Sequence, residues 1–386
     1  MQINYLSLNN FRNYSFAEFD FKPGFNLLLG ANGQGKTNAV ESIVFLATQT
    51  SHRTSSHKAL IQQGFEEAIV RAKLSNEGRE ALIEAKVLEK GSNKYFLNKQ
   101  SVTGREVQQV LNAVIFAPED LQIVRGDPSV RRSFIDQILI SRYPAAVTSL
   151  SEYERAIRHK SSLLKSLRYS QVSDNLQQTL SLWNEKIVEL GAQIVFYRHQ
   201  VISDLKPFVS DAYLKIAGSD HSPKITMKES HRNVSRETKG SLVEGSEDVV
   251  SRETIRRSME QRLQEVATDE LDKGQCLVGP HRDDLSFYLN DLPVKGYASH
   301  GETWSFVLSL KLGVARLFSE ESLSGDPVII LDDVFAELDR NRQQRLVSEI
   351  SSFQQVIVTA AVADDVPKSI EKNVFIIHEG EVTRSE

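Results

Sequence analysis

The chain has 386 residues, 40% of them hydrophobic, which is enough for one sizeable core and, we expect, for a main domain with a second lobe. The 46 Lys and Arg are outnumbered by 51 Asp and Glu, so the net charge of -5 excludes a global positive field, and any surface for nucleic acid must be local. The single cysteine, Cys276, excludes an internal disulfide and a cysteine-based zinc cluster.

Two further patterns bear on where the protein works. No apolar run approaches the length of a membrane span, and residues 1–5 lack the basic and then apolar layout of a signal peptide. A single cysteine fits a reducing compartment. We therefore expect a cytoplasmic protein with no membrane partner.

The N-terminal segment is predicted to form two extended pieces, residues 1–8 and 16–21, on either side of a turn. Apolar and polar residues alternate there, which favours two edge strands. Arg12 lies in the connecting turn. It could contact the adenine or the α-phosphate of a nucleotide, or it could be a solvated loop arginine, and the pattern leaves both open.

The next stretch matches the phosphate-binding loop pattern G-x-x-x-x-G-K-[ST] without a mismatch. An apolar run at residues 25–29, suited to a buried parallel strand, precedes it, and residues 38–47 have the apolar spacing of a helix. This strand–loop–helix context makes a chance match of a glycine-rich turn the weaker alternative. The loop residues are Gly30, Ala31, Asn32, Gly33, Gln34, Gly35, Lys36 and Thr37.

The chemistry of this loop suits the phosphates of ATP. Its glycines allow the backbone to curl so that N–H groups point inward, and the helix N-terminus adds a partial positive charge. We expect Lys36 to reach the β- and γ-phosphates and the Thr37 hydroxyl to bind Mg²⁺. The sequence therefore predicts a site for ATP with Mg²⁺.

Residues 51–58 are polar, basic and without periodicity, so we expect a loop that faces DNA through Arg53 and Lys58. Beyond it, turns separate several short β-like runs, which predicts an antiparallel sheet. Residues 113–116 are predicted to form another buried strand. The β-like runs are 68–74, 81–88 and 95–97.

From residue 128 the composition shifts to long helices. A heptad seam over 176–197 is interpreted as an ordinary core helix. An earlier helix, around 153–168, is apolar on one side and mostly basic on the others, which indicates either a solvated face or a surface for DNA phosphates. The basic residues nominated for DNA contact there are Arg155, Arg158 and Lys160.

A long mobile loop is predicted at residues 218–249, which are rich in Ser, Glu, Gly and Lys. A possible strand at 224–227 interrupts it, and a helix is predicted to follow at 254–269. We attach no chemistry to this loop.

A second catalytic pattern is the apolar strand 327–331, which ends in Asp332 and Asp333 and looks like a Walker B strand. We expect Asp332 to hold Mg²⁺ through water and Asp333 to polarise the attacking water. A doubly wound sheet brings the end of this strand and the phosphate loop to one edge. Thr359 ends a further buried strand, 355–359, near the expected γ-phosphate position.

Residues 296–303 open a predicted helix, 304–318, and resemble the signature motif of ABC-type ATPases. The order of phosphate loop, helical insertion, signature and Walker B strand is similar to that of SMC-like heads. Further segments resemble the RecF family of recombination proteins, namely 6–14, 116–121, 279–285 and 331–339.

The resemblance implies an α/β fold: an ABC-type P-loop ATPase head with an antiparallel β subdomain and a second, helical lobe. We expect residues 1–127 and 271–386 to form the ATPase lobe and 128–270 the helical lobe. The resemblance also implies signature contacts from Ser299 and Gly301, a D-loop at Asp339, nucleotide contact near Arg12, and a Q-loop equivalent at Gln122.

In function, the resemblance implies an ATP-dependent DNA-binding protein of replication, recombination and repair. It would bind double-stranded DNA at gaps or junctions, form a homodimer with ATP, and help RecO-like and RecR-like partners to load the recombinase RecA. His300 replaces the first glycine of the usual signature, and Thr359 stands where many ABC proteins place a switch histidine. We therefore expect slow, DNA-dependent ATP hydrolysis that serves as a timer.

Other functions fit the pattern less well. A transporter ATPase subunit would leave the long helical insertion and residues 279–284 unexplained. A non-catalytic structural protein of the SMC kind would need much longer coiled-coil arms than residues 153–217 can form. A small-molecule kinase would leave the signature-like stretch without a role.

Overall fold

The computed structural model describes residues 1–386 except 55, 77, 168–173, 233–250, 322–324, 369 and 385–386. Contacts divide the chain into two compact units. Unit 1 comprises Met1–Leu121, Pro207–Asp220 and Ser299–Glu386, and unit 2 comprises Gln122–Lys206 and His221–Ala298.

These boundaries differ from the predicted ones in three places. Residues 122–127 and 271–298, expected in the ATPase lobe, belong to unit 2, and the Pro207–Asp220 segment of the expected helical lobe belongs to unit 1. Most of the loop predicted at 218–249 lies outside the described residues. Its described part contains the predicted strand, β9 (Lys224–Lys228).

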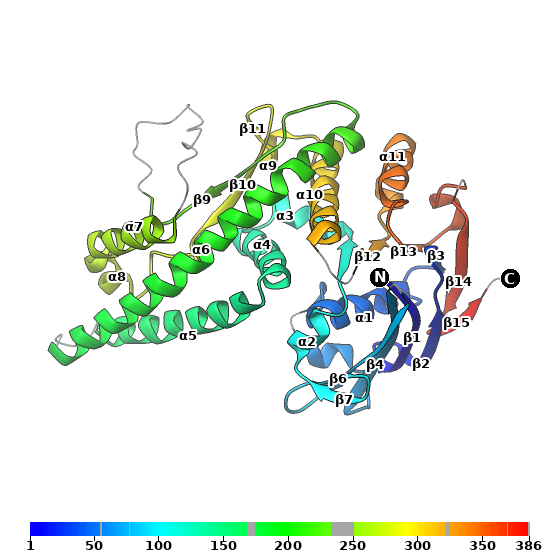
Figure 1. Cartoon of the computed structure of the whole chain (residues 1–386), viewed down its shortest axis with the longest axis horizontal. Helices are drawn as coiled ribbons and strands as arrows, with labels where there is room; N and C mark the ends of the chain where they lie inside the picture. Colours follow the sequence, from blue (N-terminus) through cyan, green and yellow to red (C-terminus); the bar gives the residue numbers. More distant parts are fainter. Residues whose placement is uncertain are drawn as a thin grey trace. The chain divides into compact units, whose positions relative to one another are not determined.

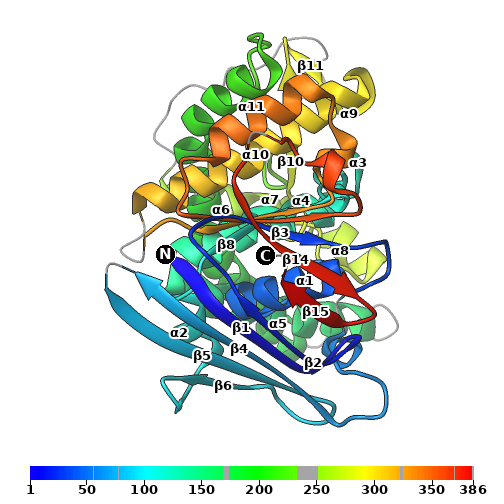
Figure 2. The same ribbon diagram turned by 90° about the vertical axis from the view of Figure 1, so that its right-hand side faces the viewer.

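Unit 1 contains an antiparallel sheet of six strands in the order β2-β1-β4-β5-β6-β7 (Figure 2). The antiparallel sheet predicted from the turns is therefore confirmed. Of the two N-terminal strands, however, only β2 lies at an edge, because β1 pairs with β4 on its other side. The strands are β1 (Gln2–Phe11), β2 (Tyr14–Asp20), β4 (Glu67–Asn76), β5 (Arg79–Leu88), β6 (Lys94–Leu97) and β7 (Gln100–Val102).

The second sheet of unit 1 has the order β15-β14-β3-β13-β12-β8, and all neighbours are parallel except β14 and β15. β12 and β13 are buried along their whole length, as expected for parallel strands covered on both faces. Each of the buried strands predicted here is present. The strands are β3 (Gly24–Leu29), β8 (Ala113–Phe116), β12 (Val328–Asp332), β13 (Gln355–Ala360), β14 (Lys372–His378) and β15 (Glu381–Arg384).

Helix α1 (Lys36–Thr48) contacts strands of both sheets, and its apolar residues belong to one core with them. Helices α10 (His300–Glu321) and α11 (Arg340–Ile350) lie on the other face of the parallel sheet (Figure 2). The short helix α2 (Gly104–Gln108) contacts α1 and β6. The phosphate loop therefore lies between a central strand and a helix that is buried on nearly every side.

Unit 2 is mainly helical and carries a small antiparallel sheet, β11-β10-β9 (Figure 1). The helix predicted at 254–269 is two helices, because the backbone departs from helical geometry at Val266 (φ -100, ψ 8). The elements are α3 (Leu121–Arg125), α4 (Pro128–Arg142), α5 (Pro144–Leu167), α6 (Asp174–Ala217), α7 (Arg252–Glu265), α8 (Ala267–Lys273), α9 (Val294–Tyr297), β10 (Asp284–Leu289) and β11 (Leu292–Pro293). Leu121 of α3 and the residues of α6 from Pro207 onward belong to unit 1.

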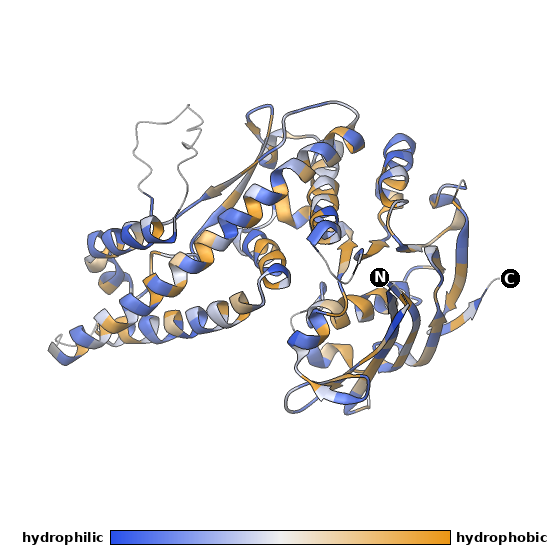
Figure 3. Cartoon of the chain, in the orientation of Figure 1, coloured by the Kyte–Doolittle hydropathy of each residue, from blue (hydrophilic) through white to orange (hydrophobic). Residues whose placement is uncertain are grey.

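The predicted heptad seam lies on α6, a helix of 44 residues that contains Pro207. Ile187, Leu190 and Ile194 of the seam are buried against Tyr153 and Ala156 of α5, so the interpretation as a core helix is confirmed. Orange apolar and blue polar stretches alternate along both helices (Figure 3). Within the part of the chain that the structure describes, no helix combines the length and apolar character needed to cross a membrane.

Candidate nucleotide-binding site

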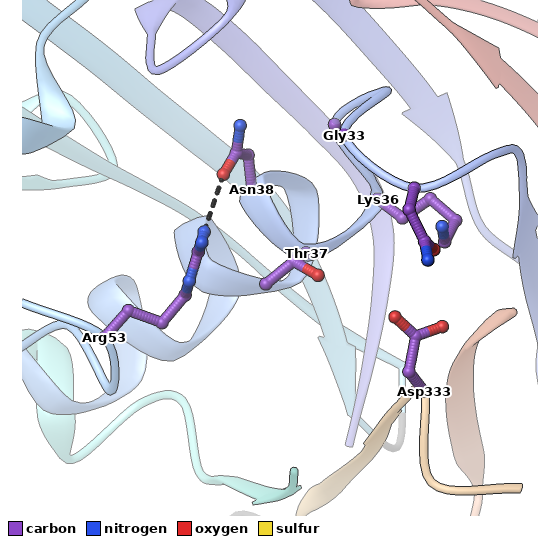
Figure 4. A pocket seen from close by; sticks show the side chains of 8 residues that line it. Gly33, Lys36, Thr37, Asn38, Arg53 and Asp333 are labelled. Carbon is purple, nitrogen blue, oxygen red and sulfur yellow. Dashed lines mark hydrogen bonds between the residues drawn. The ribbon is translucent and has the colours of Figure 1, made fainter. Parts of the chain in front are cut away.

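A pocket in unit 1 lies at the predicted phosphate loop, between β3 and α1 (Figure 4). Gly33 and Gly35 have positive φ angles of 83 and 125, which L side chains rarely adopt. A Cβ at Gly35 would lie 2.8 Å from the Asn13 and Tyr14 side chains, so glycine is required for space as well. The pocket is lined by Asn32, Gly33, Gly35, Lys36, Thr37, Asn38, Arg53 and Asp333.

The N-terminal turn holds this loop in place. Asn13 Nδ2 donates to Gln34 O at 2.9 Å, and the Tyr14 hydroxyl donates to Gly35 O at 3.0 Å. Asn13 Oδ1 also accepts from Asn38 Nδ2 at 2.8 Å. These supporting residues were not predicted from the sequence, where their signals were their position in the turn that carries Arg12 and in the RecF-like segment 6–14.

Lys36 is buried, and its ammonium group donates to Gly30 O at 2.7 Å and to Ala31 O at 3.2 Å. An ammonium group has three N–H donors, so these two carbonyls leave one for a ligand. Because carbonyl dipoles rather than a carboxylate hold it, its positive charge is not neutralised by them. This arrangement suits an anionic phosphate.

Asp332 ends β12 and is joined to the phosphate loop by a hydrogen bond of 3.1 Å from the Thr37 hydroxyl to its Oδ1 atom. Burial raises the pKa of Asp332 to about 6, with the Asp333 charge acting in the same direction and hydrogen bonds from Thr359 and Thr37 opposing it. A buried carboxylate beside a threonine hydroxyl is a donor set of hard oxygen atoms, which Mg²⁺ prefers. The residues present therefore fit the predicted magnesium site.

Asp333 lies on the opposite side of the pocket, and its carboxylate points toward Lys36 and Thr37 (Figure 4). Its φ of 51 is in the left-handed region, which is unusual for a residue other than glycine. The two neighbouring aspartates thus take different positions, because Asp332 faces Thr37 and Thr359 while Asp333 lines the pocket.

Arg12 is placed differently from the two alternatives weighed for it. Its guanidinium group forms two hydrogen bonds to Glu41, from Nε at 2.8 Å and from Nη2 at 2.6 Å, and it is not one of the residues lining the pocket. Glu41 is fully buried on α1 and also accepts a hydrogen bond from Ser51. Burial would raise the pKa of Glu41, but the bonds from Arg12 and Ser51 hold it below its ordinary value.

Arg53, predicted to face DNA, lines the nucleotide pocket instead. Its Nη1 atom donates to Asn38 Oδ1 at 3.0 Å (Figure 4). The same atom lies 3.9 Å from Glu41 Oε2. Glu41 thus contacts the two arginines that flank the loop. Its signal in the sequence was that it is the one carboxylate in a helix whose other buried residues are mostly apolar.

The signature-like residues lie at the start of α10, which begins at His300, four residues before the predicted helix. Ser299 is exposed and caps this helix: its N–H donates to Glu302 Oε2 at 2.8 Å, and its hydroxyl accepts from Glu302 N at 3.2 Å. Neither Ser299 nor Gly301 lines the described pocket.

The predicted D-loop residue Asp339 caps α11 by accepting from Arg342 N at 3.0 Å. The Arg342 side chain forms an ion pair with Asp339 and donates from Nε to Ser305 Oγ at 3.1 Å. A Cβ at Gly301 would lie 2.8 Å from Arg342 Nη1. The start of α10 and the D-loop are therefore held together, outside the pocket.

Comparisons with known proteins agree with this arrangement. A family model described as the RecF/RecN/SMC N terminal domain matches residues 2–384. A DNA replication and repair protein RecF of Clavibacter sepedonicus is 43% identical over 395 residues, which cover 100% of this chain and 95% of that protein. Another, from Leifsonia xyli subsp. xyli, is 43% identical, with 99% of each chain covered. The chain belongs to the RecF family.

Solved structures lead to the same family. The recombination mediator protein RecF with ATP, described as part of the RecFOR pathway, is 28% identical, with a TM-score of 0.86 and with 100% of this chain and 97% of that chain covered. An Smc head domain of Pyrococcus furiosus, 18% identical with a TM-score of 0.54, shares the fold. The family and the ABC-type ATPase fold predicted from the sequence are therefore confirmed, and this is a DNA replication and repair protein of the RecF family.

The remaining residues nominated for DNA contact have different environments in this RecF-family chain. Arg155 and Arg158 are exposed, and Arg158 lies 3.8 Å from Glu154. Lys58 is exposed and lies 3.9 Å from Glu89. Lys160 is a correction: its side chain is 0% exposed and pairs with Glu270 at 2.5 Å, so it offers no surface to a phosphate.

The segment 279–284, which carried much of the resemblance to RecF, belongs to unit 2. Its Pro280 carbonyl accepts from Arg198 at 2.8 Å, and the His281 ring is 2.7 Å from the Tyr153 hydroxyl. Arg131 forms two hydrogen bonds to Asp284, at 2.6 Å and 3.0 Å. Asp283 is buried and accepts from Ser230 N at 2.8 Å. This motif therefore forms a polar core for unit 2.

Proposed function

We propose that this RecF-family protein is an ATP-switched clamp on double-stranded DNA. With ATP and Mg²⁺ it forms a homodimer, binds duplex DNA at gaps or at junctions of single and double strands, and helps RecO-like and RecR-like mediators to load a RecA-type recombinase. Slow, DNA-dependent hydrolysis of ATP then ends each binding event. The protein does this in the cytoplasm, where it needs no membrane partner.

The observation that carries the proposal is the pocket in which Lys36, Thr37 and Asp333 face one another. The phosphate loop supplies backbone N–H groups, and Lys36 supplies one uncommitted N–H for the β- and γ-phosphates. Thr37 and Asp332 would hold Mg²⁺, which neutralises developing charge on the phosphates. Asp333 is the base that orients the attacking water. The related RecF structure with ATP supports the choice of nucleotide.

Dimerisation follows from the position of the signature residues. Ser299 is exposed, caps a helix of 22 residues and does not line the pocket of its own chain. The N-terminus of a helix suits a phosphate, because its N–H groups and dipole favour negative charge. A two-fold dimer would bring Ser299 and Gly301 of each chain to the γ-phosphate held by the other.

The dimer is tested with Ser299→Arg, which places a bulky cation at the expected interface and leaves the phosphate loop unchanged. Sedimentation with a slowly hydrolysed ATP analogue should show wild-type dimers and variant monomers, while both bind ATP. ATP-stimulated binding to gapped duplex should be lost together with the dimer. Ser101→Arg, at an exposed serine of edge strand β7, is the matched control and should behave as wild type. A Ser299→Arg variant that dimerises normally would refute the proposed contact.

A second candidate function is that of an ATPase subunit in another structural or transport complex of the ABC or SMC type. Measurements of DNA binding distinguish it from the proposed clamp. The clamp requires that ATP raises affinity for gapped duplex more than for blunt duplex and that DNA stimulates hydrolysis. Equal DNA affinity with and without ATP would favour the second function. Lys36→Met should abolish the effect of ATP in either case, because it removes the charge that meets the phosphates.

A further inference from the structure

Thr359 lies on β13, between the strand that leads into the phosphate loop and the strand that ends in Asp332. It is in register with Leu28 of β3 on one side and with Asp332 of β12 on the other. Its side chain is fully buried, and it does not line the nucleotide pocket. The sequence predicts Thr359 near the expected γ-phosphate position, and in the structure its side chain is not one of those that line the pocket.

The Thr359 hydroxyl joins the two neighbouring carboxylate residues. It donates its proton to Asp332 Oδ1 at 2.6 Å and accepts from the backbone N–H of Asp333 at 2.9 Å. A hydroxyl has one proton to donate. Because Asp332 takes that proton, Thr359 has none left to donate to a phosphate.

Each of these bonds fixes one feature of the site. Asp332 Oδ1 receives two hydroxyl protons, from Thr359 and Thr37, which set the orientation of its carboxylate. At Asp333 the backbone has a φ of 51, a left-handed conformation that is unfavourable for a residue other than glycine. The bond from Asp333 N to Thr359 favours this conformation, in which the Asp333 carboxylate points into the pocket (Figure 4).

We propose that Thr359 is a positioning residue that couples the two carboxylates: one hydroxyl sets the angle of the Asp332 carboxylate and the backbone turn that aims Asp333. It does so without touching the nucleotide. The inference rests on the proposed function, because it assigns Asp332 to the metal and Asp333 to the attacking water. It adds that hydrolysis requires the hydroxyl of Thr359, whereas ATP binding does not.

The test compares Thr359→Val, which keeps the shape and removes the hydroxyl, with Thr359→Ser, which keeps the hydroxyl. Loss of a group that orients a metal ligand typically reduces activity about 10- to 100-fold, so kcat for ATP hydrolysis should fall by that amount in the valine variant. KM for ATP should stay close to wild type, and the serine variant should recover most of kcat. Thr359→Ala, which also lacks the hydroxyl, replaces valine if that variant does not fold.

A second measurement separates this inference from the proposed function. Mn²⁺ affinity in the presence of a non-hydrolysable ATP analogue should be weaker in Thr359→Val by roughly 10-fold or more and restored in Thr359→Ser. Absence of hydrolysis in the wild-type protein would defeat the proposed ATPase function, and the Mn²⁺ comparison would still decide the role of Thr359. Ser309→Ala removes a buried hydroxyl from α10 that bonds the Ser305 carbonyl, and it should leave both readouts unchanged.

Three results would overturn the inference. Wild-type kcat and Mn²⁺ affinity in Thr359→Val would show that the hydroxyl is dispensable. A serine variant as defective as the valine variant would show that the methyl group rather than the hydroxyl matters. An increase in KM with unchanged kcat would show that Thr359 contacts the nucleotide.

Discussion

The nucleotide site of unit 1 and the polar core of unit 2 both bury charged side chains, but they hold them differently. In unit 1, carbonyl groups hold Lys36 and hydroxyl groups hold Asp332. In unit 2, cations and carboxylates hold one another, as in Arg198–Asp136, Arg131–Asp284 and Lys160–Glu270. A charge held by dipoles can still attract a charged ligand, whereas a paired charge serves the fold.

The largest expected effect tests the unit 1 side of this comparison. Asp333→Asn keeps the shape of the side chain but removes the base, so ATP hydrolysis should fall by about 10²- to 10⁴-fold. ATP binding should remain, and nucleotide-bound dimers should persist. Single-turnover hydrolysis and equilibrium ATP binding measure the two properties separately. Unchanged turnover would show that Asp333 is not the catalytic carboxylate.

The next largest expected effect tests the unit 2 side of the comparison. Lys160→Met leaves the Glu270 carboxylate buried without its cation, and breaking such a pair typically costs about 3–5 kcal/mol of unfolding free energy. Urea denaturation, followed by a spectroscopic signal from unit 2, measures the loss of unfolding free energy. The double variant Lys160→Met with Glu270→Leu should regain most of the stability, because no unpaired charge remains. A stable single variant would mean that the pair contributes little.

Asp283 sharpens the comparison, because it is a buried carboxylate of unit 2 that accepts a hydrogen bond from the Ser230 backbone N–H. Burial raises its pKa from an ordinary 3.8 to about 6. Since the folded state holds the proton more tightly, this group stabilises the fold below about pH 4 and loses that contribution as pH rises through about 6.

The variant Asp283→Asn cannot titrate at this position. Relative to wild type, its unfolding free energy should therefore increase by up to about 3 kcal/mol between pH 4 and pH 7. Urea midpoints at several pH values measure the difference, and Asp272→Asn, at an exposed aspartate of the same unit, is the control. Parallel pH curves for wild type and Asp283→Asn would contradict the raised pKa of Asp283.

The smallest effect concerns the surface. If Arg155 and Arg158 contact DNA phosphates, replacing each with Ala should flatten the dependence of log affinity on log salt by about one unit. Between 50 and 200 mM salt this is about a fourfold difference in affinity. Binding titrations at four salt concentrations measure the slope. The double variant Lys160→Met with Glu270→Leu, which removes a buried cation and its partner, should leave the slope unchanged, and unchanged slopes in the arginine variants would place the DNA elsewhere.

Local sequence patterns were sufficient to predict the structure wherever a short segment determines its own geometry. The phosphate loop was predictable because its glycines, its lysine and its flanking strand and helix are contiguous in the chain. Helix α11 (Arg340–Ile350) begins directly after Asp339, whose side chain supplies its N-cap, so the start of this helix is also a local feature of the sequence. Four of the parallel strands, β3, β8, β12 and β13, were predictable because their buried runs are mainly apolar.

The sequence by itself therefore determined the family, the ATPase fold and the residues of the phosphate loop and carboxylate strand. Only the tertiary structure decided which charges are available, because that depends on partners far away in the chain. Lys160 resembled a surface cation until its partner, 110 residues later, was known. Likewise, the roles of Thr359 and Glu41 arise only in the folded chain. Separate strands and loops bring Asp332 to Thr359, and they bring Arg12 and Arg53 to Glu41. The role of a buried polar group depends on its hydrogen-bond partners, which the local sequence does not specify.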